Sequence, residues 1–320
     1  MKIGLALAHQ FAVRFKAMSI EDALDKVVSM GFEAVEISGG NYPGTDFCDS
    51  NALVRDDGKI RRLRKAVEDR GLFISALDCH GNFLHPQKSI ARQHTEVQHN
   101  TVIVAEKLGV DRICTFSGCP GDSEAAKHPN WVTCAWPEEY QEIVDWQWRE
   151  KVIPFWQKEL DFIERHGVNK VCIEMHPGFV CYNPETLLKL RSSVGSAIGA
   201  NLDPSHLFWQ GIDVAMAIRK LEGTIYHFHA KDSEVDPLNS LINGPLDTKP
   251  YSDAANRYWR FRTVGYGQDI ATWKHVISAL RLVGYDFVLS MEHEDNLVSV
   301  EEGLSKGFNF LKEIMLKETS

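Results

Sequence analysis

The stretch SIEDALDKVVSMGFEAVEIS, residues 19–38, carries the pattern that decides the fold. Ser19 followed three residues later by Asp22 resembles a capping box, which marks the start of a helix. Apolar residues then recur at helical spacing up to Gly31, a residue that readily adopts the left-handed conformation at which many helices end. The run AVEIS at 34–38 follows at once and predicts a strand. This unit is a helix that leads directly into a strand.

The same alternation extends along the whole chain. The N-terminal run MKIGLALAH predicts the first strand, and further strands are predicted at 73–77, 113–117, 170–174, 197–202, 224–229 and 286–291. Further helices are predicted at 56–70, 88–108, 148–166, 185–193, 212–221, 270–282 and 299–316. Eight strands and eight helices in a chain above about 250 residues predict an α/β fold, a (β/α)8 TIM barrel that forms a single domain over residues 1–320. The rival is a doubly wound open sheet, whose glycine-rich phosphate fingerprint is missing here.

Two connections are longer than a barrel requires. They cover 118–147, after the fourth strand, and 230–268, after the seventh, and both are rich in Pro, Gly, Trp and Tyr. Loops at the carboxyl ends of barrel strands usually form the active site. We expect these two loops to wall a pocket, with an oligomer contact as the alternative, and the aromatic residues Trp131, Trp136, Trp146 and Trp148 to be candidates for stacking on a ligand.

Charge and composition exclude several classes of function. The 35 Lys and Arg against 44 Asp and Glu give a net charge of −9, which argues against a nucleic-acid backbone or an anionic membrane as partner. No apolar stretch approaches the roughly 20 residues of a membrane span. The N-terminal apolar run is short for a signal peptide. Seven cysteines without metal-type spacing indicate free thiols in a reducing cytoplasm. We expect a cytoplasmic protein whose partner is a small molecule.

Parity within the strands identifies a candidate metal site. Alternate side chains of a strand face the same side, so every second residue points into a barrel. The inward sets on four strands are Cys172–Glu174–His176, Gly199–Asn201–Asp203, Ile225–His227–His229 and Val288–Ser290–Glu292. Each set brings a metal-binding residue to the mouth: Glu174, Asp203, His229 and Glu292.

Three carboxylates and one imidazole at one barrel mouth would repel each other unless a cation lay between them. This donor set favours one divalent ion, most of all Mn²⁺, with Mg²⁺, Co²⁺ or Zn²⁺ as alternatives. For any single residue of the four, a helix cap or a surface ion pair is the ordinary alternative. A metal-bound carbonyl makes the neighbouring C–H group acidic, and a nearby carboxylate can move that proton.

The order and spacing of several motifs resemble those of the sugar isomerase and epimerase superfamily of xylose isomerase-like TIM barrels. The motifs are GFEAVEI at 31–37, IEMHP at 173–177, DPSH at 203–206, HAKD at 229–232, GYGQD at 265–269 and MEH at 291–293. The resemblance runs from Gly31 to about Glu294. It implies one divalent metal, commonly manganese, held by the residues that match the four candidates, with a keto sugar as substrate. It also implies that Glu174 and Glu292 act as the acid/base pair of an isomerase or epimerase.

Other side chains near the strand ends are candidates for substrate binding. The resemblance places His206 on substrate oxygens, and His80, His176 and Arg262 are further candidates. Each of these residues also has a structural alternative. For His206 it is support of Asp203, and for His176 it is a turn fixed by Pro177. For His80 it is a core histidine with its hydrogen bonds satisfied, and for Arg262 it is an ion pair within a loop. Glu36 has inward parity on the second strand and is expected to accept hydrogen bonds at the barrel mouth. His227 lies one layer deeper than His229 and is expected to fill the core or support the site.

A lyase that eliminates a group β to the carbonyl of a 3-oxo-glycoside is the alternative function. Four stretches resemble the catalytic subunits of C-glycoside deglycosidases, which can pair with a small β-sandwich subunit: TFSGCPGD at 115–122, NWVTCAWP at 130–137, NLDPSHLFWQGID at 201–213 and YWRFRTVGYG at 258–267. Those lyases use a histidine base, for which the loop after the fourth strand offers only His128. A homo-oligomer is the other form of assembly considered. An endonuclease IV-like nuclease and a non-catalytic sugar-binding barrel are weaker alternatives, the first because of the acidic charge.

Overall fold

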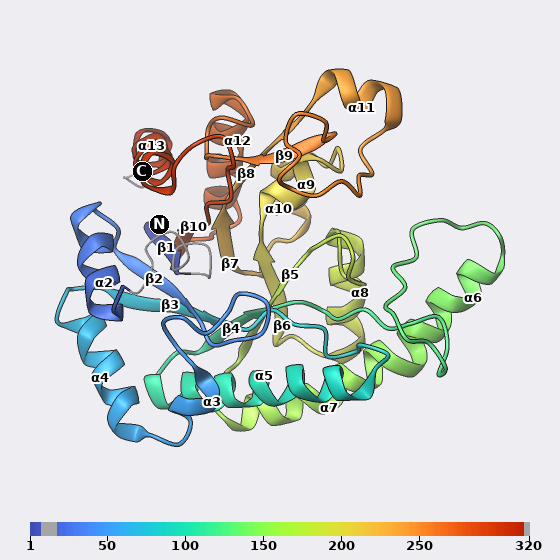
Figure 1. The fold of residues 1–320 in the computed structure, drawn as a ribbon, viewed down its shortest axis with the longest axis horizontal. Helices are drawn as coiled ribbons and strands as arrows, with labels where there is room; N and C mark the ends of the chain where they lie inside the picture. Colours follow the sequence, from blue (N-terminus) through green and yellow to red (C-terminus); the bar gives the residue numbers. More distant parts are fainter. Residues whose placement is uncertain (8–17, 317–320) are drawn as a thin grey trace.

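Eight parallel strands close into a barrel in the computed structural model, which describes residues 1–7 and 18–316 (Figure 1). The order around the barrel is β1-β10-β7-β6-β5-β4-β3-β2. The strands are β1 Lys2–Leu7, β2 Ala34–Ser38, β3 Phe73–Asp78, β4 Arg112–Thr115, β5 Lys170–Glu174, β6 Ile198–Leu202, β7 Ile225–Ala230 and β10 Val288–Met291. The predicted single-domain TIM barrel is confirmed, although residues 8 and 9 of the first predicted strand lie outside the described part.

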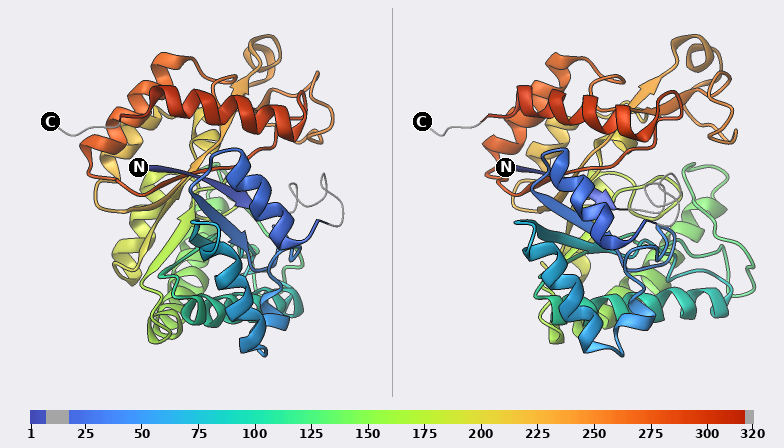
Figure 2. Two further views of the ribbon diagram at one scale, coloured as in Figure 1. Left: turned by 90° about the vertical axis from the view of Figure 1, so that its left-hand side faces the viewer. Right: turned by 60° about the vertical axis from the view of Figure 1, so that its left-hand side comes forward.

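Eight main helices surround the barrel (Figures 1 and 2). They are α2 Ile20–Ser29, α4 Asp57–Glu68, α5 Lys88–Leu108, α7 Ile153–Arg165, α8 Pro184–Val194, α10 Val214–Lys220, α12 Ile270–Leu282 and α13 Val300–Ile314. The last of these, α13, contacts β1 and β10, where the first and last strands of the barrel meet. The apolar stripes of the helices pack on the outward faces of the strands, which places the main core between the two layers.

The opening unit of the chain folds as its sequence predicts. Ser19 is the N-cap of α2, and its hydroxyl accepts a hydrogen bond of 3.0 Å from the backbone N–H of Asp22. Gly31 has a φ of +93°, a conformation that costs little only for glycine. The strand β2 then begins at Ala34 and is completely buried.

Several short helices are absent from the sequence prediction. They are α3 Ser50–Leu53, α6 Glu139–Trp146 and α9 Pro204–Phe208. The π-helical segment η1 Gln147–Val152 forms the start of the helix predicted at 148–166. The segments α6 and η1 run directly into α7, so the helix predicted at 148–166 starts earlier and the connection predicted at 118–147 ends in helix. No residue of α6 is fully buried, although Val144 packs partly buried against the main core.

The inner face of the barrel is lined by small and polar side chains. Ala76, Cys114 and Cys172 form a separate buried cluster there, and Tyr226 packs against it. The predicted parity of β7 is wrong at its start, where Ile225 packs on the outer core and Tyr226 faces the inner cluster. The cause is an irregularity in the register with β6, which shifts the pairing by one residue before His227.

The long connection after β7 folds over the mouth of the barrel. It contains the antiparallel ribbon of β8 Asp232–Val235 and β9 Trp259–Arg262, with α11 Pro237–Asn243 between them (Figure 1). The buried carboxylate of Asp232 accepts hydrogen bonds from the backbone N–H groups of Gly265 and Gly267 and from Trp273 Nε1. This anchor fixes the ribbon to α12.

The structure also bears on the cysteines and on the hydropathy of the helices. All seven cysteines are free thiols, and only Cys134 is exposed. Among the described residues, no helix is long and apolar enough to cross a membrane.

Candidate metal centre

The four predicted metal ligands meet at one end of the barrel. Each offers one ligand atom, and these atoms of Glu174, Asp203, His229 and Glu292 lie within 4.8 Å of one another. Nδ1 of His229 is 3.1 Å from Glu292 Oε2 and 3.4 Å from Glu174 Oε2. Glu174 ends β5, Asp203 follows β6, His229 lies in β7 and Glu292 follows β10. The barrel closure therefore gathers residues that are far apart in the sequence.

Asp203 has one carboxylate oxygen that no hydrogen bond satisfies. Its Oδ1 atom accepts the backbone N–H of Ser205 at 2.8 Å and so caps α9. Its Oδ2 atom is buried without a hydrogen-bond partner, 3.4 Å from His206 Nε2. A buried carboxylate oxygen is costly unless it is paired or binds a cation. Together with two further carboxylates and an imidazole, this oxygen fits a divalent ion such as Mn²⁺.

Cationic groups compensate the carboxylates of the cluster. Lys231 Nζ lies 2.9 Å from Glu292 Oε1 and 3.8 Å from Asp203 Oδ2. Burial raises the pKa of Glu292, but Lys231 and His229 outweigh this effect and lower it below its usual range. The pKa of Glu174 is likewise well below its usual range, because the charge of His80 and a hydrogen bond from His206 outweigh the effect of burial. Both carboxylates are therefore held ionised.

Three of the four predicted substrate-binding residues surround Glu174. His206 Nε2 lies 3.2 Å from Glu174 Oε1, and His80 Nε2 lies 3.0 Å from Glu174 Oε2. His176 lies beside His206, with 4.1 Å between the ring centroids and an angle of 56° between the ring planes. Its Nδ1 atom is 2.6 Å from the carbonyl oxygen of Pro177, and burial lowers the pKa of His176 to about 3. The neutral imidazole donates Nδ1–H to that carbonyl, which leaves Nε2 as an acceptor.

Arg262 is placed elsewhere by the structure. Its guanidinium pairs with Glu234 of β8 and with Asp295, which follows β10, and it does not line the cavity at the mouth. The four tryptophans considered for stacking are also absent from the cavity lining; Trp148 is buried, whereas Trp136 is 76% exposed. The ion pairs of Arg262 therefore stabilise the ribbon.

A cavity of about 360 Å³ opens above the metal cluster. Besides the cluster and the three histidines, several residues not singled out as binding residues from the sequence line it: Tyr42, Asp78, Phe116, Lys231, Tyr251, Phe261 and Glu294. Lys231 and Glu294 each lie two residues beyond a cluster member and share its parity, so extending the parity rule by one step would have found both. Tyr251 and Phe261 come from the long connection after β7. The alternation of WRFR at 259–262 is typical of a strand, but it does not show that this strand reaches the cavity.

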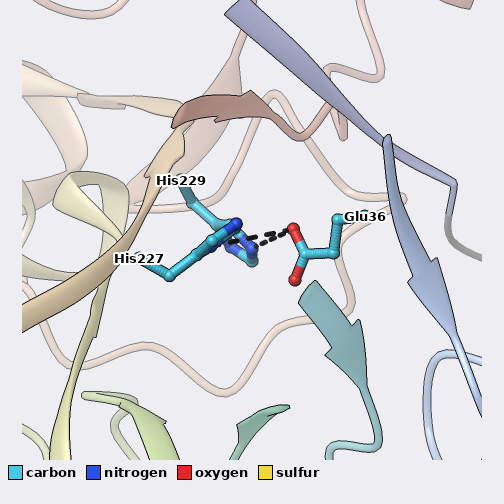
Figure 3. Close-up of side chains that lie close together, drawn as sticks. All are labelled: Glu36, His227 and His229. Carbon is cyan, nitrogen blue, oxygen red and sulfur yellow. Dashed lines mark hydrogen bonds and ion pairs between the residues drawn. The ribbon is translucent and has the colours of Figure 1, made fainter. Parts of the chain in front are cut away.

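A second group of polar side chains lies deeper in the barrel (Figure 3). Glu36 Oε2 is 2.9 Å from His229 Nε2 and 4.0 Å from His227 Nδ1. Glu36 and His227 are completely buried. Glu36 and His227 thus lie beside the metal cluster and share His229 with it. Glu36, predicted as a hydrogen-bond acceptor at the barrel mouth, lies in this deeper group.

Comparison with known proteins places the chain among proteins of this architecture. A family model described as "Xylose isomerase-like TIM barrel" matches residues 24–314. The uncharacterized protein YfiH of Bacillus subtilis is 35% identical over 298 residues, which cover 92% of this chain and 95% of that protein.

Solved structures share the fold at low sequence identity. A D-tagatose 3-epimerase-like protein superposes with a TM-score of 0.65 at 18% identity, covering 98% of this chain and 97% of the other. A xylose isomerase domain protein from Planctomyces limnophilus gives a TM-score of 0.63 at 15% identity, covering 98% and 96%. A D-psicose 3-epimerase studied with D-fructose gives 0.59 at 15% identity, covering 98% of each chain. From the family match along nearly its whole length, the chain belongs to the xylose isomerase-like TIM barrel family.

Proposed function

We propose that the chain is a divalent-metal-dependent isomerase or epimerase that removes a proton beside the carbonyl group of a keto sugar. The observation that carries the proposal is the convergence of Glu174, Asp203, His229 and Glu292 beside the cavity. Structural neighbours named as 3-epimerases support the same class of chemistry. The free thiols agree with a reducing compartment, for which we propose the cytoplasm.

We assign the metal to these four residues because their donors are three carboxylates and one imidazole. Mn²⁺ is the ion that we propose, with Mg²⁺, Co²⁺ or Zn²⁺ as alternatives. When bound, the ion would polarise the carbonyl group of the sugar and make the neighbouring C–H group more acidic.

We assign the proton transfers to Glu174 and Glu292. The strands that carry them are separated by β6 and β7 in the barrel, so the two carboxylates approach the cavity from different sides. Neighbouring cations hold both ionised, and an ionised carboxylate can accept the proton of the sugar. An epimer forms when the second carboxylate, after taking a proton from water, delivers it to the other face of the same carbon. An isomer forms when the first carboxylate returns its proton to the neighbouring carbon.

We assign the binding of sugar hydroxyl groups to His80, His176 and His206. All three line the cavity. Because His176 Nδ1 donates to Pro177, its Nε2 atom is available to accept a hydrogen bond from a hydroxyl group. Nδ1 of His206 is buried without a hydrogen-bond partner, and a hydroxyl group of the sugar would satisfy it.

The charge of the cavity favours a sugar without a phosphate group. Of the charged residues among the described lining, Asp78, Glu174, Glu292 and Glu294 are acidic, and the cations Lys231, His80 and His229 already pair with these carboxylates. No cation of this lining is therefore left over for a phosphate group. An anionic substrate would meet like charge there. The rings of Tyr42, Phe116, Tyr251 and Phe261 supply apolar faces for the C–H groups of a sugar.

Isotope exchange in deuterated water tests the proposal. The purified chain is incubated with Mn²⁺ and matched pairs of substrates, such as D-fructose and D-fructose 6-phosphate, and the sugars are analysed by mass spectrometry. We expect deuterium in the unphosphorylated ketose and its epimer or isomer. Exchange confined to the phosphates would contradict the proposed substrate class, and no exchange in a broad ketose panel would contradict the proposed reaction.

A lyase acting on 3-oxo-glycosides is the second candidate function. The observation that favours it is the aromatic character of the cavity wall, which could hold an aromatic aglycone beside the sugar. The same incubation with a 3-oxo-glucoside of a phenol separates the two functions. Release of the phenol without turnover of any free ketose would favour elimination over isomerisation.

A further inference from the structure

The buried imidazole of His229 presents its two nitrogens to different partners. Nδ1 lies 3.1 Å from Glu292 and 3.4 Å from Glu174, on the side of the metal cluster. Nε2 lies 2.9 Å from Glu36 Oε2 (Figure 3). The Asn201 amide nitrogen also lies 3.1 Å from Nε2, but it has an acceptor of its own in Glu174 Oε2 at 3.1 Å, which leaves Glu36 as the acceptor beside Nε2. A histidine binds a metal through a nitrogen that carries no proton, and its other nitrogen then carries the proton and needs an acceptor.

We propose that Glu36 is a positioning residue that accepts Nε2–H of His229 and thereby presents Nδ1 to the metal. This inference rests on the metal site of the proposed function. The Oε2 atom of Glu36 also accepts a hydrogen bond of 2.8 Å from Ser290 Oγ, and the carboxylate is completely buried. Two donors on one oxygen fix the direction of the carboxylate and, through it, the orientation of the imidazole ring.

The hydrogen bonds of His227 argue that Glu36 positions His229 and does not belong to a second metal site. By spacing alone, Glu36, His227 and His229 could hold an ion. Both nitrogens of His227 are already engaged, however, with Nδ1 at 3.0 Å from Asn201 Oδ1 and Nε2 at 3.2 Å from Ser75 Oγ. An amide oxygen only accepts hydrogen bonds, so Nδ1 of His227 carries a proton and is not available to bind a metal ion. His227 therefore supports the layer in which Glu36 lies.

Metal binding to the full-length chain provides the first test. Mn²⁺ is titrated into the protein, and the free ion is measured by its electron paramagnetic resonance signal. We expect one ion per chain in the wild type and a 10- to 100-fold weaker affinity, still with one ion per chain, in Glu36→Gln and Glu36→Ala. The glutamine variant keeps an acceptor oxygen but loses the charge, so its affinity should lie between those of the wild type and the alanine variant.

The position of the proton provides a readout that a merely structural role would not change. Zn²⁺, which is diamagnetic, is bound to protein labelled with ¹⁵N-histidine, and the signal of His229 is assigned with His229→Gln. Long-range ¹H–¹⁵N spectra should show the proton on Nε2 in the wild type. In Glu36→Ala, the signal should shift or split, because neither tautomer is then fixed by a carboxylate.

A buried glutamate elsewhere in the chain provides the matched control. Glu159 is 4% exposed, and it accepts a hydrogen bond of 2.7 Å from Gln98 between α5 and α7, away from the cavity lining. Glu159→Gln should keep the affinity for Mn²⁺ and the His229 spectrum of the wild type. Circular dichroism verifies that each variant is folded.

Three results would overturn the inference. Two ions per wild-type chain and one in Glu36→Gln would make Glu36 a ligand of a separate site. Unchanged affinity and an unchanged His229 spectrum in both Glu36 variants would show that Glu36 does not position the ring, while leaving the proposed function in place. Absence of metal binding by the wild type itself would overturn the proposed metal chemistry as well.

Discussion

The ammonium group of Lys231 lies 2.9 Å from the Oε1 atom of Glu292. Lys231 is 3% exposed and also contacts Glu294 Oε2 at 3.0 Å, so one buried cation joins two carboxylates at the cavity wall. It thereby holds Glu292 in one orientation and keeps it ionised. The same positive charge opposes the binding of a metal ion nearby. Loss of Lys231 should therefore change metal affinity and turnover in opposite directions.

Lys231→Met is therefore expected to separate metal binding from catalysis. Loss of the positive charge should leave the affinity for Mn²⁺ equal to that of the wild type or tighter. Loss of the contact that orients Glu292 should reduce the rate of deuterium exchange about tenfold or more. Mn²⁺ titration and exchange rates, measured on the same preparation, check both parts. A variant with weaker metal binding and normal turnover would contradict the assigned role.

Removal of either proposed proton-transfer group is expected to stop exchange. Glu174→Gln and Glu292→Gln keep the size of the side chain but cannot accept a proton, and general acid–base catalysis contributes about 10²- to 10⁴-fold. The exchange rate should fall by roughly that factor, with the far-ultraviolet circular dichroism unchanged. Near-normal exchange in either variant would remove that residue from the acid/base pair.

Periodicity explains why most of the cluster could be predicted from the sequence. Glu174, Asp203 and Glu292 stand at the ends of regular strands, where the alternation of side chains fixes their direction. The same rule was wrong for Tyr226, because a shift of register between β6 and β7 cannot be seen in one strand alone. His229 was nevertheless placed correctly, since it follows that shift.

The positions of side chains in the loops at the barrel mouth could not be predicted from the sequence. Arg262 was expected to bind substrate, but the ribbon in which it lies brings it to Glu234 and Asp295. Pairing of β8 with β9 depends on residues about thirty positions apart and has no local pattern. Tyr251 and Phe261 line the cavity for the same reason, and neither was identified.

Addition and removal of metal should change the stability of the folded chain. A ligand that binds only the folded state stabilises it, by about 2.7 kcal/mol at a hundredfold excess over its dissociation constant. For a chain of 320 residues, the melting temperature should rise by roughly 4 °C with Mn²⁺ and return to its starting value with a chelator. Asp203→Asn should lose this shift, because the unsatisfied Oδ2 oxygen becomes part of an amide. A full shift in that variant would exclude Asp203 as a ligand.

A pH-dependent contribution to stability is expected from His94. Burial lowers the pKa of His94 below its ordinary value of 6.5, and its Nδ1 atom accepts the backbone N–H of Asn82 at 2.8 Å. Because the unfolded chain binds the proton more readily, this contribution is present above about pH 6.5 and is lost as the pH falls below it. In urea titrations between pH 7 and 5, His94→Ala should lose less stability than the wild type.

Asp232 is expected to connect the stability of the barrel with the affinity for substrate. Its buried carboxylate accepts N–H groups from Gly265 at 2.9 Å, Gly267 at 3.1 Å and Trp273 at 3.0 Å. Asp232→Ala leaves these donors without an acceptor, and each buried donor left unpaired costs about 1–3 kcal/mol. The free energy of unfolding should therefore fall by roughly 3–5 kcal/mol in urea titrations. Asp232→Asn keeps one acceptor oxygen and should lose less.

The catalytic consequence of this anchor differs from that of the acid/base residues. Asp232 holds the ribbon that carries Phe261, a residue of the cavity wall, but Asp232 itself does not line the cavity. Loosening the ribbon should weaken substrate binding while the carboxylates of the metal cluster stay in place. The KM of Asp232→Asn should rise severalfold with a smaller change in kcat, measured on whichever ketose shows exchange. A loss of kcat without a change in KM would place the effect at the metal cluster and contradict the assigned role of the ribbon.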